Sequence, residues 1–286
     1  MPQANGFLVK AGNEFKAALP SIAEAILDTL IGGKDIMLFK QLFEPVSFTY
    51  SYLLACPETG QCALIDPVID TAERDLEILQ KLGLKLTYTI DTHVHADHLT
   101  GALKLKQLTG SQICYPAMDQ FSCVDIGLRE GESFSIGNIE LHPLFTPGHT
   151  DTHHCYIVDD QTHTLLFSGD ALLIDACGRT DFQQGDTTSL YHSIRDKLFI
   201  LPDETLVYPA HNYEGRFIST IAQEKKRNPR IKESTSLEDF TTIMNNLDLP
   251  YPQKIDFAVP GNQMCGQCPP NVPEEFRAPC GAYDQG

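Results

Sequence analysis

The sequence predicts an α/β protein in which mixed sheets and helices pack as a sandwich. Short apolar runs typical of strands alternate with helical segments, and several of the strand runs come in hairpin-like pairs. With 286 residues, 42% of them hydrophobic, the chain can bury a sizeable core. This length fits one large domain or two modest ones.

The elements follow in order from residue 48. The expected strands lie at residues 48–54, 62–65, 86–90, 113–115, 132–134, 139–145, 155–159, 164–167 and 205–208. The expected helices lie between them at residues 72–82, 99–108, 190–198 and 216–227.

We divide the chain into three segments. Residues 1–36 form an N-terminal extension, helical over 15–31, that we expect to dock on the main domain or on a partner subunit. Residues 37–260 form the main domain. The tail at 261–286 is rich in Pro, Gly and Cys, so we expect an irregular segment with free thiols at Cys265, Cys268 and Cys280.

The charge and the ends of the chain limit the possible partners. The formal net charge of −17 repels phosphate backbones, which excludes nucleic acid. No stretch is long and apolar enough to cross a bilayer. The first residues carry no secretory signal, and the lack of Arg before residue 73 argues against a mitochondrial transit peptide. We therefore expect a cytoplasmic protein in which most cysteines are free thiols.

A dense group of metal-ligand types follows the strand expected at 86–90. His93, His95, Asp97 and His98 form an H-x-H-x-D-H run. Imidazole and carboxylate are the ligands that suit zinc, iron and manganese. This spacing is specific enough to predict a metal site rather than a set of structural histidines.

Three further candidates also follow strands. His149 comes after the strand ending at residue 145, Asp170 after 164–167 and His211 after 205–208. In α/β architecture functional groups gather at the carboxyl edge of the sheet, so we expect these side chains to meet the His93 run. Gly148 and Gly169 permit the tight backbone that turns a ligand inward.

The remaining histidines receive structural interpretations. His142, His163 and His192 are expected to be structural or solvated. His153 and His154 follow His149 closely, and one of them could orient a metal ligand. We favour solvent or loop hydrogen bonding for both, because unassigned polar residues are usually exposed.

The order of the seven ligand candidates resembles that of the metallo-β-lactamase superfamily. The resemblance implies an αβ/βα four-layer sandwich, with residues 37–260 as its catalytic domain. It also allows two metal sites bridged by Asp170. The first would use His93, His95 and His149, and the second Asp97, His98 and His211.

Within that superfamily the chain looks like the persulfide dioxygenases over about residues 37–268. The resemblance rests on the runs FEPVS, IDPV, DALLI, CGRTDFQ, PAHNY and IDFAVP, which begin at residues 43, 65, 170, 177, 209 and 255. It implies one Fe(II) per chain bound by His93, His149 and Asp170. His95, Asp97, His98 and His211 would then surround the iron and orient its ligands.

The same resemblance implies oxidation of glutathione persulfide by O₂ and water to glutathione and sulfite. We expect Arg179 to hold a glutathione carboxylate, because its guanidinium fork suits carboxylates. The other interpretation of Arg179 is a structural ion pair with Asp181 or Asp186. Tyr213 is the candidate for a hydrogen bond near the iron or the substrate, and a homodimer is the candidate assembly.

Two alternatives stay open at this stage. A glyoxalase II-like hydrolase would cleave hydroxyacylglutathione with two metals and would use all seven ligands directly. A non-catalytic metal-binding or electron-transfer module is the other alternative. The ligand types alone do not choose between one iron and two zincs.

Overall fold

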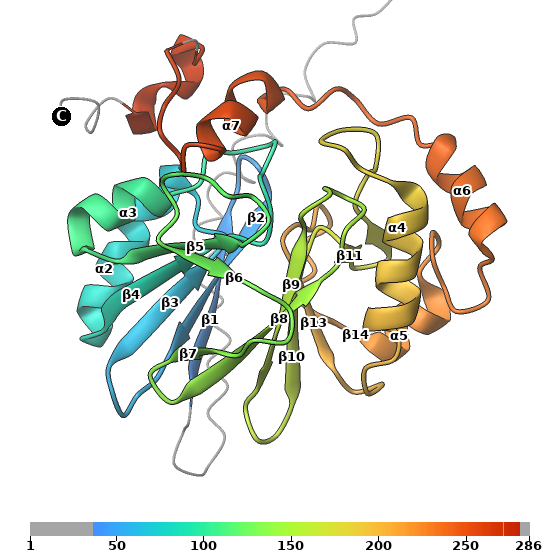
Figure 1. The fold of residues 1–286 in the computed structure, drawn as a ribbon, viewed down its shortest axis with the longest axis horizontal. Helices are drawn as coiled ribbons and strands as arrows, with labels where there is room; N and C mark the ends of the chain where they lie inside the picture. The colour runs from blue at the N-terminus through green and yellow to red at the C-terminus, as the bar shows by residue number, and fades with distance from the viewer. Residues whose placement is uncertain (1–36, 271, 281–286) are drawn as a thin grey trace, which may run out of the picture.

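The computed structural model describes residues 37–270 and 272–280, in which two six-stranded sheets face each other (Figure 1). The first sheet runs in the order β1 to β6, with strands Leu38–Glu44, Thr49–Ala55, Gln61–Ile65, Lys85–Ile90, Gln112–Pro116 and Ile126–Leu128. Its first three strands are antiparallel and the following ones pair in parallel. The sheet is therefore mixed, as the sequence predicts.

The second sheet runs in the order β14-β13-β10-β9-β8-β7. These strands are Ser219–Thr220, Leu206–Pro209, Thr164–Gly169, His154–Asp159, Ile139–Phe145 and Phe134–Ile136. The β10 and β13 strands pair in parallel, whereas the other neighbours are antiparallel. A small hairpin of β11 (Leu172–Leu173) and β12 (Ala176–Cys177) follows β10.

Helices cover the outer face of each sheet (Figure 1). The η1 turn (Ile69–Thr71), α2 (Ala72–Leu82) and α3 (Ala102–Thr109) lie beside the first sheet. The second sheet is covered by α4 (Thr187–His192), the π-helical η2 (Ser193–Leu198), α5 (Ile221–Arg227) and α6 (Leu237–Asn245). This arrangement confirms the predicted αβ/βα four-layer sandwich.

The β2 strand shows why the layers form. Its residues alternate between two buried faces, as a strand with a two-residue period requires. Tyr50, Tyr52 and Leu54 join the core between the sheets, and Leu53 and Ala55 join the core under α2 and α3. A strand that is apolar on both faces is stable only when it is covered on both sides.

The observed elements differ from the expected ones in two ways: some begin or end at other residues, and several were not expected at all. The helix expected at 216–227 begins only at Ile221, because the Thr220 hydroxyl accepts a hydrogen bond from the Gln223 backbone N–H and caps α5 there. Strand β1, β6 and helices α6 and α7 (Ile255–Asn262) lie in segments where no element was expected. The extension at 1–36 lies outside the described residues.

The tail departs from the expected free thiols. Disulfides join Cys123 to Cys265 and Cys268 to Cys280, so the prediction for the three tail cysteines is wrong. The reason is tertiary: the loop after β5 lies against the end of α7 and brings Cys123 within reach of a thiol 142 residues away. The cysteines at 56, 62, 114, 155 and 177 are free and buried.

The beginning of the predicted tail is part of the packed domain. The α7 helix crosses the boundary drawn at residue 260, and the last turns of the described chain are the short η3 (Glu274–Phe276) and η4 (Ala278–Cys280). Among the described residues, no helix combines the length and apolar character needed to cross a membrane.

Candidate metal centre

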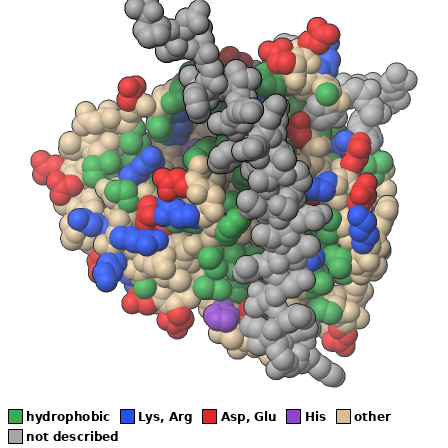
Figure 2. Space-filling model, turned by 180° about the vertical axis from the view of Figure 1, so that it is seen from behind, with side chains coloured by type: hydrophobic (Ala, Val, Ile, Leu, Met, Phe, Trp, Pro, Cys, Tyr) green, Lys and Arg blue, Asp and Glu red, His purple; other side chains and the backbone are tan. Residues whose placement is uncertain are grey.

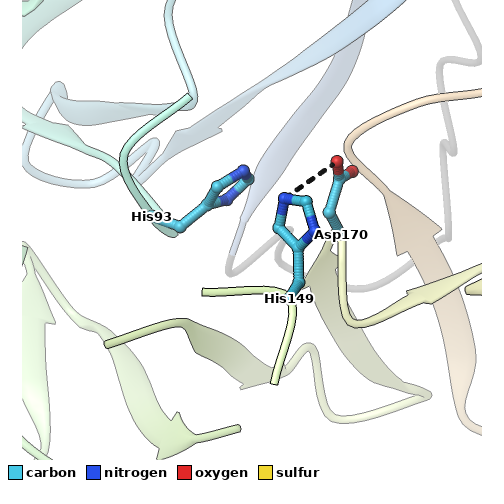
Figure 3. Close-up of side chains that lie close together, drawn as sticks. All are labelled: His93, His149 and Asp170. Atoms are coloured by element: carbon cyan, nitrogen blue, oxygen red, sulfur yellow. Dashed lines mark ion pairs between the residues drawn. The ribbon is translucent and has the colours of Figure 1, made fainter. Parts of the chain in front are cut away.

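Three predicted ligands meet where strands of both sheets end. His93 follows β4, His149 follows β8 and Asp170 directly follows β10. Their side chains point toward one another (Figure 3), and one ligand atom from each lies within 4.8 Å of the other two. We call these three residues the metal triad.

The hydrogen bonds of His149 leave one of its ring nitrogens free for a metal. Its Nδ1–H donates to the backbone carbonyl of Arg179 at 2.8 Å, which fixes the tautomer and leaves the Nε2 lone pair exposed. That Nε2 lies 3.6 Å from Asp170 Oδ2 (dashed line in Figure 3). His149 therefore presents its ligand atom to the centre of the triad.

His93 is oriented in a similar way by the chain that precedes it. The Thr92 hydroxyl donates to Asp66 Oδ2 at 3.0 Å, so its oxygen accepts from His93 Nδ1–H at 2.8 Å. Burial, reinforced by the neighbouring imidazoles, lowers the pKa of His93 well below its usual value. The ring is thus neutral, and its Nε2 lone pair remains available.

The third residue of the triad, Asp170, is an anionic carboxylate, and one of its two oxygens already accepts a hydrogen bond. Asp170 Oδ1 accepts a hydrogen bond from His211 Nδ1 at 2.7 Å, which leaves Oδ2 for the metal. Burial opposes ionisation of Asp170, but the His211 ring outweighs this effect and lowers the carboxyl pKa. The triad therefore offers two neutral imidazoles and one carboxylate.

A second group beside the triad is internally hydrogen-bonded. We call Asp97, His98 and His211 the paired cluster. His211 Nε2 donates to Asp97 Oδ2 at 2.9 Å, and His98 Nδ1 donates to the same oxygen at 3.0 Å. The Thr49 hydroxyl lies 3.1 Å from His211 Nε2 and completes the group.

His211 uses both of its ring nitrogens. Burial disfavours its charged form, yet the carboxylates of Asp170 and Asp97 outweigh burial and raise the His211 pKa well above its usual value. The ring is therefore an imidazolium bridge between two carboxylates, with no lone pair for a metal.

The remaining ligand candidate of the run, His95, is hydrogen-bonded to a carboxylate outside both groups. Its Nε2 donates to Asp66 Oδ1 at 3.1 Å and lies 3.6 Å from Asp91 Oδ1. Burial lowers the His95 pKa, but the carboxylates, Asp66 foremost, outweigh burial and raise it to about 9. His95 Nδ1 and His98 Nε2 are buried without a hydrogen-bond partner.

Two residues that shape the site were not predicted as functional. Asp66 directly follows β3 and accepts from the Thr92 backbone N–H at 2.7 Å, so the strand-end rule used for Asp170 would have found it. Asn262 is fully buried at the end of α7. Its amide donates to the carbonyls of His95 and His98 at 2.9 and 2.8 Å, a contact with no local sequence signal.

His153 and His154 were expected to be exposed, and this prediction is wrong. Both side chains are buried, with 0% and 2% of their surface exposed. The loop after His149 turns back under the triad, because the Thr146 backbone N–H bonds the His153 carbonyl and the His154 backbone N–H bonds the Thr92 carbonyl. His142 and His192 are exposed, and His163 lies at the surface in a turn, as expected.

Arg179 is engaged by its own loop. Its guanidinium forks onto Asp181 at 2.6 and 2.7 Å, while Nη1 donates to the Pro250 carbonyl at 2.8 Å. Arg179 thus forms the structural ion pair with Asp181 that was the alternative to a substrate contact. Tyr213 is 66% exposed and stacks on His211, with ring centroids 6.1 Å apart. The predicted substrate roles of both residues stay predictions.

A cavity of about 270 Å³ is lined by residues that follow two members of the triad in the chain. Val94 and Thr150, the residues after His93 and His149, line it together with Gln183, whose amide donates to the Val94 carbonyl at 2.6 Å. The three triad side chains themselves do not line this cavity, so it is a candidate place for a small molecule near the triad and not at the ligand atoms.

The comparison with protein families defines the class of protein. A model of the metallo-beta-lactamase superfamily matches residues 45–211, which is more than half of the chain. The chain therefore belongs to this superfamily, and its two sheets with flanking helices are the fold of that superfamily.

Individual relatives narrow the class. The mitochondrial persulfide dioxygenase ETHE1 of Homo sapiens is 45% identical over 251 residues, which cover 87% of this chain and 96% of that protein. The crystal structure of ETHE1 from Myxococcus xanthus has a TM-score of 0.77 at 46% identity and covers 80% of this chain and 100% of that one. A hydroxyacylglutathione hydrolase of a Polaromonas species is 37% identical over 61% of this chain and 66% of that protein. The chain is thus an enzyme of the persulfide dioxygenase family.

The compartment of the protein, which we predict to be the cytoplasm, stays a prediction.

Proposed function

We propose that this enzyme oxidises glutathione persulfide with O₂ and water to glutathione and sulfite at a single Fe(II) held by the metal triad. The observation that carries the proposal is that each triad residue keeps a ligand atom free, whereas both ring nitrogens of His211 are hydrogen-bonded. His93, His149 and Asp170 each keep one ligand atom free within 4.8 Å of the others. The family of the relatives supplies the reaction.

The donors of the triad fit Fe(II). Two imidazoles and one carboxylate are the facial set typical of non-haem iron oxygenases, which leaves coordination positions open. An iron ion bound there supplies the redox chemistry with O₂ that no side chain of the protein provides. The balance of the reaction is one persulfide, one O₂ and one water converted to one thiol, one sulfite and two protons.

The side chains around the triad hold the ligands in place. The Arg179 carbonyl fixes the His149 ring, and His211 fixes one oxygen of Asp170. The cavity lined by Val94 and Thr150 is the proposed place for the persulfide, since these residues directly follow His93 and His149 in the chain. Holding both reactants in one orientation is the main contribution that the protein can make to such a reaction.

The proposed substrate contacts are Arg179 and Tyr213. The Arg179 guanidinium already donates two hydrogen bonds to one carboxylate, that of Asp181. A glutathione carboxylate has the same shape and could take the place of Asp181. Tyr213 lies against His211 and beside the solvent, where its hydroxyl can reach a ligand at the mouth of the site. A homodimer stays a prediction, which size-exclusion chromatography with light scattering will check.

An oxygen electrode tests the proposed reaction. Iron-loaded protein given glutathione persulfide should consume one O₂ for each sulfite formed, and S-D-lactoylglutathione should not be cleaved at a comparable rate. Thioester cleavage without any O₂ demand would overturn the proposal in favour of a hydrolase.

One observation favours the hydrolase as a second candidate. The buried, unpartnered His95 Nδ1 and His98 Nε2 belong, with Asp97, to a second group that could hold a metal. A dinuclear site would activate water for hydroxyacylglutathione cleavage. The hydrogen bonds of the paired cluster argue against it, because Asp97 Oδ2 already accepts from His98 and His211, and both nitrogens of His211 are hydrogen-bonded to carboxylates. Since the chain is an enzyme of a known family, we do not retain the non-catalytic alternative.

A further inference from the structure

A buried histidine that is not a metal ligand lies beneath the metal triad. His153 is 0% exposed, and its ring lies against that of His93 with centroids 5.0 Å apart and planes 30° from parallel. The ring of His149 lies 6.2 Å from it in an edge-to-face arrangement. His153 is therefore a buried ring that lies against both imidazoles of the triad.

The hydrogen bonds of His153 fix its tautomer. The backbone N–H of Asp170 can only donate, so His153 Nε2, at 3.1 Å, must accept with its lone pair. The proton then resides on Nδ1, which donates to the Thr146 hydroxyl oxygen at 2.9 Å. Both ring nitrogens are satisfied, and neither is left for a metal.

The residue before Asp170 is shaped to receive this ring. Gly169 has a backbone φ of +50°, a conformation that L side chains rarely adopt. A Cβ atom at position 169 would lie only 2.5 Å from His153 Nε2. The ring therefore occupies the space that a side chain would need, and the turn that carries Asp170 is built around it.

We propose that His153 is a positioning residue for the metal centre. It fixes the main chain of Asp170 and the ring of His93 in the geometry that binds the metal, without binding it. Asp170 is then held at both ends, with its backbone N–H on His153 and its Oδ1 on His211. This inference rests on the proposed metal site.

The neighbouring residue provides a matched control. His154 is also buried, at 2% exposure, but its Nδ1 bonds only the Thr152 carbonyl at 2.8 Å and its ring packs on Phe145. A buried histidine that touches no ligand separates loss of positioning from general damage to the core.

The test compares His153→Leu, His153→Gln and His154→Gln with the wild-type enzyme, using Co(II) as the probe. The measurements are the Co(II) dissociation constant, the visible d–d absorption spectrum and the steady-state constants of the iron-loaded enzyme. We expect His153→Leu to weaken Co(II) binding by roughly 10- to 100-fold and to shift the spectrum. We also expect it to lower kcat while KM for glutathione persulfide changes little.

His153→Gln should restore most of the affinity, because a Gln Oε1 can accept the Asp170 N–H where Nε2 does now. His154→Gln should bind Co(II) with the wild-type constant and spectrum. If His153→Leu fails to fold, Thr146→Val, which removes the oxygen that accepts from Nδ1, should shift the spectrum in the same direction.

Wild-type Co(II) affinity and spectrum in His153→Leu would overturn the inference, and so would an equal change in His154→Gln. Binding of Co(II) is measured without turnover. A wild-type enzyme that binds metal but consumes no O₂ would therefore refute the proposed reaction and not the role of His153.

Discussion

The metal triad and the paired cluster contain the same types of side chain, yet their hydrogen bonds differ. In the triad, His149 and His93 each donate a hydrogen bond from Nδ1 to a protein acceptor and keep Nε2 free. In the paired cluster, both nitrogens of His211 are hydrogen-bonded to carboxylates, whereas His98 bonds Asp97 through Nδ1 alone and its Nε2 has no partner. The partners of a histidine, and not its presence in a motif, decide whether it can bind a metal.

The difference extends to charge. His93 is neutral because burial lowers its pKa, whereas two carboxylates keep His211 protonated despite burial. A cation is disfavoured beside an imidazolium and favoured beside neutral imidazoles and a carboxylate. On the proposed site, the triad would therefore bind the metal, and the paired cluster would hold Asp170 in place.

The largest expected effect comes from the triad itself. Asp170→Asn removes the carboxylate, so metal binding and dioxygenase activity should fall by more than about 100-fold. Metal content after dialysis and O₂ uptake measure both losses. Asp160→Asn, at a carboxylate that caps the β9–β10 turn, is the control and should behave as wild type. A variant at position 170 that retains its metal would show that Asp170 is not a ligand.

A substitution in the paired cluster should act on stability and affinity rather than on stoichiometry. His211→Asn removes the bridge between Asp97 and Asp170, two partly exposed carboxylates, of which Asp97 keeps its hydrogen bond to His98. Breaking a fully buried ion pair costs about 3–5 kcal/mol of unfolding free energy, so the loss here should be smaller than that, and metal affinity should fall by roughly 10-fold or more. Urea denaturation and metal titration give both values. A fall from two metals to one per chain would mean instead that His211 is a ligand.

Removal of the metal provides a milder test. A chelator should lower the melting temperature of the wild-type enzyme, because a ligand at about 100 times its Kd stabilises the folded state by about 2.7 kcal/mol. In a chain of this size that corresponds to about 5–10 °C. The Asp170→Asn variant should show almost no chelator effect. Equal shifts in both proteins would place the stabilising metal outside the triad.

The smallest effect at the metal should follow loss of the Cys123–Cys265 disulfide. Cys123→Ser removes a cross-link between the loop after β5 and the end of α7, at a cost of about 2–4 kcal/mol in unfolding free energy. Metal content should not change, since neither cysteine touches the triad or the paired cluster. Guanidinium denaturation and metal analysis of one sample measure both. Loss of metal in this variant would tie the tail to the centre.

The seven ligand candidates could be predicted from sequence because their signals are local. His149 and Asp170 each follow an apolar run, and the end of a strand specifies where such a side chain lies. The choice of the triad among the seven candidates rests on the family resemblance. The sandwich of mixed sheets was predictable from short apolar runs that alternate with helical segments, and its four layers were implied by the resemblance. Helix α7 escaped prediction: it carries Pro260, which is unusual inside a helix.

The features that were missed depend on tertiary contacts. Nothing near Cys123 indicates that it pairs with Cys265, and nothing near Asn262 indicates that its amide holds the carbonyls of His95 and His98. His153 was expected to bond solvent or its own loop, because unassigned polar residues are usually exposed. Its burial follows from the loop that folds back against β4 and β10, which a linear pattern does not encode.

The metal content of the enzyme tests the difference between the two groups most directly. Protein reconstituted with excess Fe(II) under anaerobic conditions and then desalted should contain one iron per chain by elemental analysis. The same value should be found for His211→Asn at saturating metal, and a value near zero for Asp170→Asn. Two metal ions per wild-type chain, with one lost in His211→Asn, would contradict the account.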